Sequence, residues 1–150
     1  MKGIPTSLSP HLMSVLMSMG HGDEIVLADG NFPAASLGRE FIVCNGSDLL
    51  ELLDAVLRFL PLDTGMSSCV FLMAATEDCQ PRALWQSYQR IICHHEPVFS
   101  SCTVLEKPDF YARAKAAYAI VSTGETTRYA NLILRKGVVN PDQLPARYNG

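Results

Sequence analysis

Residues 9–33, SPHLMSVLMSMGHGDEIVLADGNFP, predict a helix followed at once by a buried strand. Ser9 before Pro10 is a typical helix start, and Gly20 is a typical helix end. Apolar side chains recur between them at the spacing i, i+3, i+4 and i+7, at Leu12, Val15, Leu16 and Met19. This pattern predicts one amphipathic helix.

The strand of this stretch is the apolar run 24–28, EIVLA. The turn-forming residues 29–33 end it, because Asp, Gly, Asn and Pro favour turns. His21 and Asp29 are therefore expected at opposite ends of one strand or in its flanking loops.

The rest of the chain alternates helices and strands. Helices are predicted from a Ser47 cap to Pro61, from Gln80-Pro81 onward, and from Pro108 to about Ala116. Strands are predicted at residues 70–75, 98–105, 118–122 and 131–134. This order predicts a single α/β domain over residues 1–150, with helices covering a mostly central sheet and a polar tail from about residue 140.

Composition narrows the class of protein. The 150 residues are 48% apolar and 18% charged, which suits one compact domain. The formal net charge is -3 and the basic residues are scattered, so nucleic acid is not an expected partner. No apolar run approaches the roughly 20 residues that span a bilayer, and no secretion signal is recognisable. We therefore expect a cytoplasmic protein with no membrane partner.

Five cysteines without CxxC spacing favour reduced thiols in the cytosol. Cys93-His94-His95 suggests a metal site at first sight, but adjacent helical positions point about 100° apart. A helix end at which the dipole favours histidine explains this cluster better, so no metal site is predicted.

Polar residues gather at segment ends in four places, residues 20–23, 28–29, 106–107 and 128–131. Ligands of open α/β sheets bind where loops leave the strand ends, so these segments are the first candidates for a site. None of them matches GxSxG, a Walker loop or HExxH. The residue types are those of a proton-transfer or sugar-binding pocket.

His21 lies between two glycines, which let the backbone turn sharply and leave the imidazole accessible. It is a natural general acid or base, because histidine titrates near neutral pH. A position just after a helix end, where the dipole favours a cationic ring, explains His21 equally well. For Asp29 alone, a turn is favoured over a sugar-hydroxyl contact.

Tyr129 and Asn131 are two apart in an extended segment, so they share one face and can hold one small ligand; a polar strand edge is an equal alternative. Lys107 and Tyr111 are four apart at a helix start and can face one cleft, although a solvated lysine and a core tyrosine are the usual interpretations. Asp63 is explained by a turn alone.

Two ordered motifs resemble a known family of sugar enzymes. The first is residues 19–29, MGHGDEIVLAD, with Phe32-Pro33. The second comprises residues 110–114 (FYARA), 123–125 (TGE), 129–134 (YANLIL) and 136–138 (KGV). Together they resemble the fucose mutarotase/ribose pyranase family nearly from end to end. Gly22, Glu24 and residues 61–64 and 110–111 look like the fucose branch, with the ribose branch as the alternative.

The resemblance implies a three-layer α/β/α fold with a central, mostly parallel or mixed sheet. It also implies assembly into rings, with a decamer expected, and no cofactor. The implied activity is interconversion of the α and β anomers of L-fucopyranose, while some members interconvert pyranose and furanose forms of ribose. The expected ligand is thus a neutral monosaccharide, L-fucose or alternatively D-ribose.

The resemblance also carries over to single residues. His21 matches the family's proton donor, and Asp29 matches its acidic sugar-binding position. Tyr129, Ala130 and Asn131 match its sugar-binding strand.

Three further residues match only part of the family pattern. Lys107 stands where relatives carry Arg or His, so it keeps the charge without the guanidinium fork. Asp63 and Tyr111 match positions of the animal-like fucose enzymes.

These matches suggest a mechanism for ring opening. Mutarotation needs one proton at the ring oxygen and the loss of one from the anomeric hydroxyl. His21 is the predicted acid/base, with Tyr111 or Asp63 as the second catalytic group. A non-catalytic sugar-binding module is the competing hypothesis, and the intact His21 argues against it.

Overall fold

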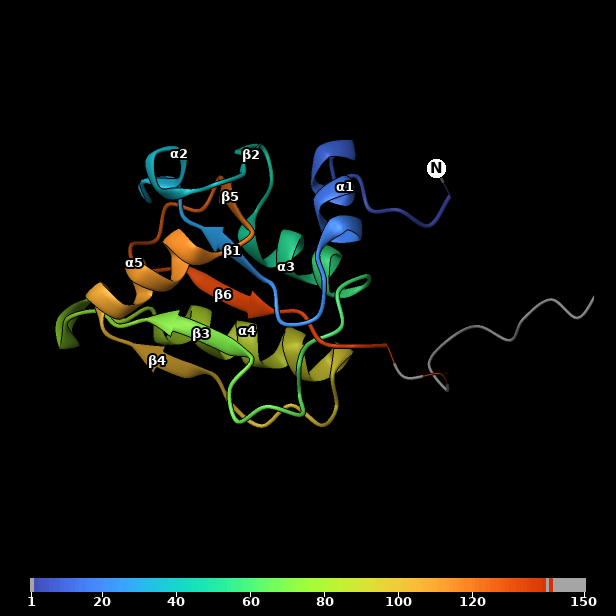
Figure 1. The fold of residues 1–150 in the computed structure, drawn as a ribbon. Coiled ribbons are helices and arrows are strands. Elements are labelled where there is room, and N and C mark those ends of the chain that lie inside the picture. Colours follow the sequence, from blue (N-terminus) through green and yellow to red (C-terminus); the bar gives the residue numbers. More distant parts are fainter. Residues whose placement is uncertain (1, 140, 142–150) are drawn as a thin grey trace, which may run out of the picture.

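A computed structural model of the chain describes residues 2–139 and 141. Its centre is a six-stranded sheet in the order β2-β5-β1-β6-β3-β4 (Figure 1). The strands are β1 (Glu24–Ala28), β2 (Phe41–Cys44), β3 (Val70–Met73), β4 (Thr103–Leu105), β5 (Ala119–Thr123) and β6 (Leu132–Arg135). β5 runs parallel to β1 and β2, and β4 runs parallel to β3. β6 is antiparallel to both β1 and β3, so the sheet is mixed.

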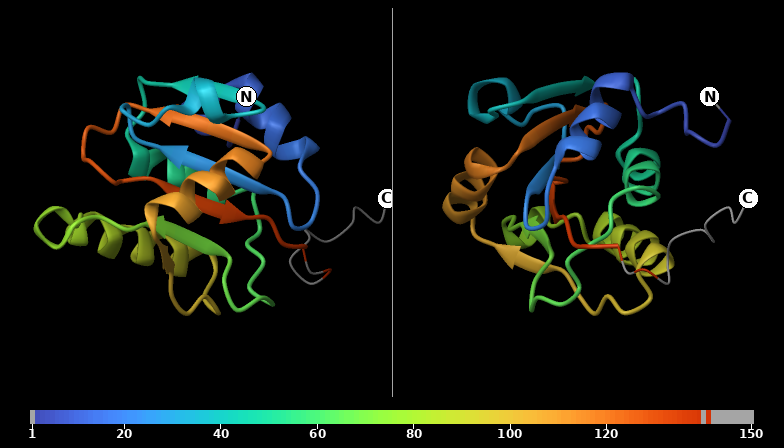
Figure 2. Two further views of the ribbon diagram at one scale, coloured as in Figure 1. Left: turned by 60° about the vertical axis from the view of Figure 1, so that its left-hand side comes forward. Right: turned by 45° about the vertical axis from the view of Figure 1, so that its right-hand side comes forward.

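Helices cover both faces of the sheet, with α1, α3 and α4 on one side and α2 and α5 on the other (Figure 2). They are α1 (Pro10–Ser18), α2 (Ala34–Leu37), α3 (Leu49–Leu57), α4 (Arg82–His95) and α5 (Lys107–Ala116), with a 3-10 turn η1 (Glu77–Cys79).

The four inner strands, β1, β3, β5 and β6, have two buried faces because both sides of the sheet are covered there, whereas the edge strands β2 and β4 are partly exposed. In β1, Ile25 and Leu27 pack into the core under α1, α3 and α4, whereas Val26 and Ala28 pack under α2 and α5. A strand buried on both faces reads as a continuous apolar run, which is the pattern of residues 24–28. The predicted three-layer α/β/α fold is thereby confirmed.

The start of α1 agrees with the prediction, since the Ser9 hydroxyl accepts a hydrogen bond from the Leu12 N–H at 3.1 Å. The prediction that Ser47 caps the next helix is wrong. Asp48 is the cap, and its carboxylate accepts from the N–H groups of Leu50 and Glu51. A carboxylate satisfies two free N–H groups at once, which one hydroxyl rarely does.

Two short elements, β2 and α2, were not predicted. The strand predicted at 98–105 is shorter than expected, because the Phe99 N–H bonds back to the Glu96 carbonyl and Val98 is 76% exposed. Only Thr103–Leu105 pairs with the sheet. The tail predicted from about residue 140 falls almost wholly outside the described residues.

The topology brings several chain segments to one edge of the sheet. β1, β3 and β4 end there, and β6 begins there because it runs the other way. Within residues 2–139 and 141, no helix has the length and apolar character needed to cross a membrane.

Candidate functional site

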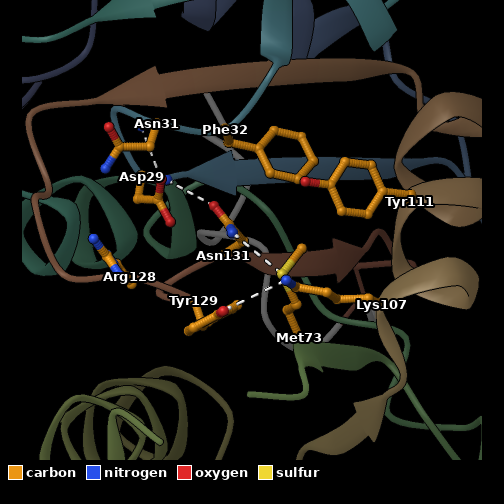
Figure 3. Close-up of a pocket in the computed structure, with 9 residues that line it drawn as sticks. All are labelled: Asp29, Asn31, Phe32, Met73, Lys107, Tyr111, Arg128, Tyr129 and Asn131. Carbon is orange, nitrogen blue, oxygen red and sulfur yellow. Dashed lines mark hydrogen bonds between the residues drawn. The ribbon is translucent and has the colours of Figure 1, made fainter. Parts of the chain in front are cut away.

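A pocket of about 390 Å³ opens at this edge (Figure 3). It is lined by Asp29, Asn31, Phe32, Met73, Lys107, Tyr111, Arg128, Tyr129 and Asn131. These residues come from the ends of β1 and β3, the start of α5 and the segment that leads into β6. Four segments that are distant in the sequence thus supply one concave site.

Asp29 and Asn131 form the buried base of the pocket, with exposed fractions of 4% and 3%. The Asp29 N–H donates to the Asn131 side-chain oxygen at 2.8 Å, and the Asn31 N–H donates to the Asp29 carboxylate at 2.9 Å. The Asp29 carboxylate therefore forms the predicted turn and also faces the cavity (Figure 3). The two interpretations of Asp29 are compatible.

Tyr129 has a left-handed backbone, with φ +62°, just before β6 begins, so the prediction that Tyr129 and Asn131 lie in one extended segment is wrong, although both line the pocket. Such a conformation is uncommon for a residue with a side chain and needs support from its surroundings. The support comes from Tyr88 of α4, whose hydroxyl donates to the Ala130 carbonyl at 2.6 Å. Burial, with the carboxylates of Glu125 and Asp29 adding to it, raises the pKa of Tyr88 above its usual value, so the phenol stays a neutral donor.

Lys107 and Tyr129 face each other across the pocket mouth. The Lys107 ammonium lies 3.4 Å from the Tyr129 hydroxyl and 4.7 Å from the centre of its ring. Tyr111 stacks on Phe32 with ring centres 5.3 Å apart. Lys107 and Tyr111 therefore face one cleft, as predicted, and the stacked rings of Phe32 and Tyr111 form an apolar wall of it.

The structure brings five of the predicted site residues together, namely Asp29, Lys107, Tyr111, Tyr129 and Asn131. Ala130 is fully buried and does not line the cavity.

His21 and Asp63 lie elsewhere. His21 Nε2 is 3.3 Å from the Asp63 carboxylate, and both residues lie at the end of the sheet where β1 begins and β6 ends, opposite Asp29. The expectation that β1 separates His21 from Asp29 is confirmed. Asp63 is buried, while the His21 side chain is 59% exposed.

Four lining residues were not predicted. Asn31 and Phe32 lie in the turn after β1, Met73 ends β3, and Arg128 precedes Tyr129. Arg128 lies in the polar segment 128–131, and Phe32 lies in the first motif that resembles the family. Position near the end of a strand was therefore the signal that could have found them. Met73 carried no polar signal, although its sulfur lies 3.7 Å from the Asn131 amide nitrogen.

His95, at the end of α4, pairs with Asp54 of α3 at 2.8 Å. This contact and an ion pair with Arg58 hold the pKa of the Asp54 carboxyl below its usual value, against a smaller effect of desolvation. Within the Cys93-His94-His95 cluster, His95 therefore makes a structural contact at the end of α4.

The sequence pattern of the RbsD / FucU transport protein family matches residues 2–139. The chain belongs to this family. One RbsD / FucU relative, the fucose mutarotase of Bos taurus, is 46% identical over 151 residues, which cover 96% of this chain and 97% of the relative. The sequence-based recognition of the family is confirmed.

Two solved structures extend the RbsD / FucU comparison. The fucose mutarotase of Streptococcus pneumoniae in complex with L-fucose is 46% identical and superposes with a TM-score of 0.88. The match covers 93% of this chain and 100% of that chain. Bacillus subtilis RbsD complexed with D-ribose is 23% identical, with a TM-score of 0.74 over 89% of this chain and 95% of that chain. The second likeness shows the fold alone.

Proposed function

We propose that this chain is an L-fucose mutarotase, which interconverts the α and β anomers of L-fucopyranose. The observation that carries the proposal is the pocket base, where the buried Asp29 carboxylate and Asn131 amide face a cavity rimmed by the Tyr111 and Tyr129 hydroxyls. Such groups suit a neutral, hydroxyl-rich ligand. Full-length similarity to enzymes named for fucose supports this sugar over ribose.

The shape of the pocket supports a monosaccharide. Its volume of about 390 Å³ lies at the small end of ligand sites, which span roughly 300–1,000 Å³. Phe32 and Met73 give it an apolar side. L-fucose carries a methyl group on C5 where an ordinary hexose carries a hydroxymethyl, so an apolar patch favours the deoxy sugar.

The catalytic pair is assigned to a second copy of the chain. His21 and Asp63 pair with each other at the end of the sheet opposite the pocket, so one chain cannot place them on its own ligand. The exposed His21 imidazole is accessible to a neighbouring pocket. A ring of copies, with a decamer as the expected assembly, repeats this contact at every site.

The reaction then follows from proton positions. One group protonates the ring oxygen as another takes the proton of the anomeric hydroxyl, and the bond from C1 to the ring oxygen breaks to leave an aldehyde. Rotation about the C1–C2 bond and the reverse transfers close the ring on the other face. His21 is the acid/base, Tyr111 or Asp63 is the second proton carrier, and Asp29, Lys107, Tyr129 and Asn131 hold the hydroxyls.

No cofactor enters this mechanism, because opening and closing the hemiacetal need only proton transfers and change no oxidation state. The cytoplasm is the expected location, where the five free thiols remain reduced.

The test is NMR magnetisation exchange between the two anomeric protons of L-fucose, with D-ribose in parallel. Wild type should accelerate the fucose exchange, His21→Ala should abolish most of the acceleration, and His11→Ala, a second exposed histidine, should retain it. Acceleration for ribose alone would assign the chain to the pyranase branch. Binding of fucose without acceleration would leave only a binding module.

Mixing two variants tests the shared site. His21→Ala keeps an intact pocket and Asp29→Ala keeps an intact histidine, so hybrid assemblies regain sites made from one copy of each. Random mixing should restore about one quarter of the sites. No recovery after refolding the two variants together would contradict a site shared between two copies of the chain.

A further inference from the structure

The end of the sheet that carries His21 holds a network of charged side chains. The Asp63 carboxylate accepts from Arg135 Nε at 3.1 Å through the same oxygen that lies 3.3 Å from His21 Nε2. A second nitrogen of Arg135 lies 4.0 Å from Glu24. Glu24 in turn accepts two-pronged hydrogen bonds from Arg113, at 2.5–3.0 Å.

The two carboxylates of this network are buried, so the cation that pairs with them matters. The side chains of Asp63 and Glu24 are only 11% and 12% exposed, and a carboxylate removed from water needs a paired cation. Arg113 is engaged with Glu24 and packs over the Phe71 ring at 3.6 Å. Arg135 is the cation that reaches both carboxylates.

The backbone around Arg135 fixes the same two groups. The Arg135 carbonyl accepts from the Asp63 N–H at 3.1 Å, and the next carbonyl, of Lys136, accepts from the Gly22 N–H at 2.8 Å. The end of β6 thus holds the loop of His21 on one side and the segment of Asp63 on the other. Gly22 adopts φ +86° beside the Arg135 guanidinium, where an added Cβ would lie 3.5 Å away.

We infer that Arg135 is a positioning residue for mutarotation, which aims the Asp63 carboxylate at His21 and offsets its negative charge. The inference rests on the proposed role of His21 as the acid/base. A histidine beside a buried carboxylate without a counter-ion would be held in its protonated form. Arg135 binds the same carboxylate oxygen and supplies that counter-ion, so the Asp63 charge is offset where it faces His21.

Other charged groups around His21 are already engaged. The Asp23 carboxylate accepts from the Gly20 N–H at 2.7 Å. The Lys136 ammonium donates to the Leu16 and Met19 carbonyls at the end of α1, at 3.0 and 2.5 Å. Loss of the Arg135 charge therefore leaves the Asp63 carboxylate beside His21 without its counter-ion, whereas Glu24 keeps Arg113. A carboxylate without a counter-ion favours the protonated form of the neighbouring imidazole.

The experiment compares Arg135→Gln with Arg135→Lys, and uses Arg58→Gln as a matched loss of charge. Arg58 pairs with Asp54 on α3 and is half-exposed, away from this network. The readouts are kcat and KM for anomer exchange as a function of pH, and the NMR titration of the His21 imidazole.

Arg135→Gln should lower kcat at pH 7 by about 10-fold to 100-fold with KM for L-fucose nearly unchanged. Both the acid limb of the pH profile and the His21 titration should move up by about one pH unit. Arg135→Lys should keep the wild-type midpoint while recovering only part of kcat, because it retains charge without the fork. Arg58→Gln should match wild type.

An unchanged His21 titration in Arg135→Gln would overturn the inference, whatever happens to the rate. That outcome is distinct from a failure of the proposed function, in which wild type would not accelerate exchange or His21→Ala would remain active. If Arg135→Gln does not fold, Arg135→Lys still decides: an unshifted midpoint with reduced kcat supports the inference, and a wild-type kcat contradicts it.

Discussion

The two ends of the sheet are built from different interactions. At the pocket end, hydrogen bonds join Asp29, Asn31 and Asn131, and aromatic rings stack beside them. At the other end, a network of ion pairs runs from His21 through Asp63 and Arg135 to Glu24. The first end suits recognition of a neutral ligand, and the second suits control of a proton.

This difference has a physical basis. At the pocket end the buried Asp29 carboxylate is held by hydrogen bonds and can accept from a sugar hydroxyl, whereas control of protonation requires fixed charges close to the titrating group. The two requirements conflict if every group shares one small cavity. Placing them at opposite ends of a strand lets each be packed separately, and the proposed assembly of copies would bring them together.

The largest expected effect separates the two ends kinetically. His21→Ala should lower kcat by roughly 100-fold to 10,000-fold, because it removes a general acid/base. Asp29→Asn should instead raise KM by about 10-fold, because it weakens a contact made in both the ground and transition states. Exchange rates over a series of L-fucose concentrations would separate a lower kcat from a higher KM. The same change in both variants would contradict separate roles for the two ends of the sheet.

A pair of glycine variants tests how each end is packed. An added Cβ would lie 2.5 Å from the Leu62 carbonyl oxygen at Gly137, and 2.5 Å from the Asn45 carbonyl oxygen at Gly124. Each alanine substitution should therefore lower the free energy of unfolding by about 1–3 kcal/mol, measured by urea denaturation.

The same pair should differ in activity. Gly137→Ala pushes on the segment that carries Asp63 and should lower kcat, whereas Gly124→Ala lies beyond β5 at the pocket end and should raise KM. Gly46→Ala, with open space at its Cβ, is the control and should change neither stability nor kinetics. A fall in kcat from Gly124→Ala would contradict the assignment of the two ends.

The smallest effect belongs to an ion pair outside both ends. The pKa of Asp54 is lowered by His95 and then Arg58, so its contribution to stability is present above the usual aspartate pKa of about 4 and is lost as the pH falls through the folded value. Asp54→Asn should lower the free energy of unfolding by less than about 1 kcal/mol at pH 7, because the pair is partly exposed.

The difference between Asp54→Asn and wild type should shrink below about pH 4. Denaturation at pH 7 and at pH 3.5 measures it, and kcat should be unchanged at neutral pH. A difference that grows on acidification would reverse the assigned sign.

Much of the fold was predictable from local pattern. The run 24–28 and the helix from Pro10 were recognised because buried strands and amphipathic helices have distinct periods. β2 escaped prediction because four residues, FIVC, are too few to show a period between turn-forming neighbours. The strand at 98–105 was overextended because β-branched composition does not reveal which residues pair with the sheet.

The candidate site was predictable only as a set of strand ends. Asp29 and Asn131 were both suspected, but their contact spans 102 positions and depends on β6 running antiparallel to β1. Met73 was missed because an apolar residue at a strand end has no distinguishing signal. The ion pair between Asp63 and Arg135 was missed for a related reason, since the sequence does not show which charged residues are close together in the fold.

The sequence by itself determined the alternation of elements, the family, and the separation of His21 from Asp29 by one strand. These follow from local spacing and from ordered motifs, which need no knowledge of distant contacts. Only the tertiary structure decided that β6 lies between β1 and β3, and hence which residues share the pocket and which share the ion-pair network. Strand order is set by the joint burial of both faces of the sheet, a property of the whole core rather than of any segment.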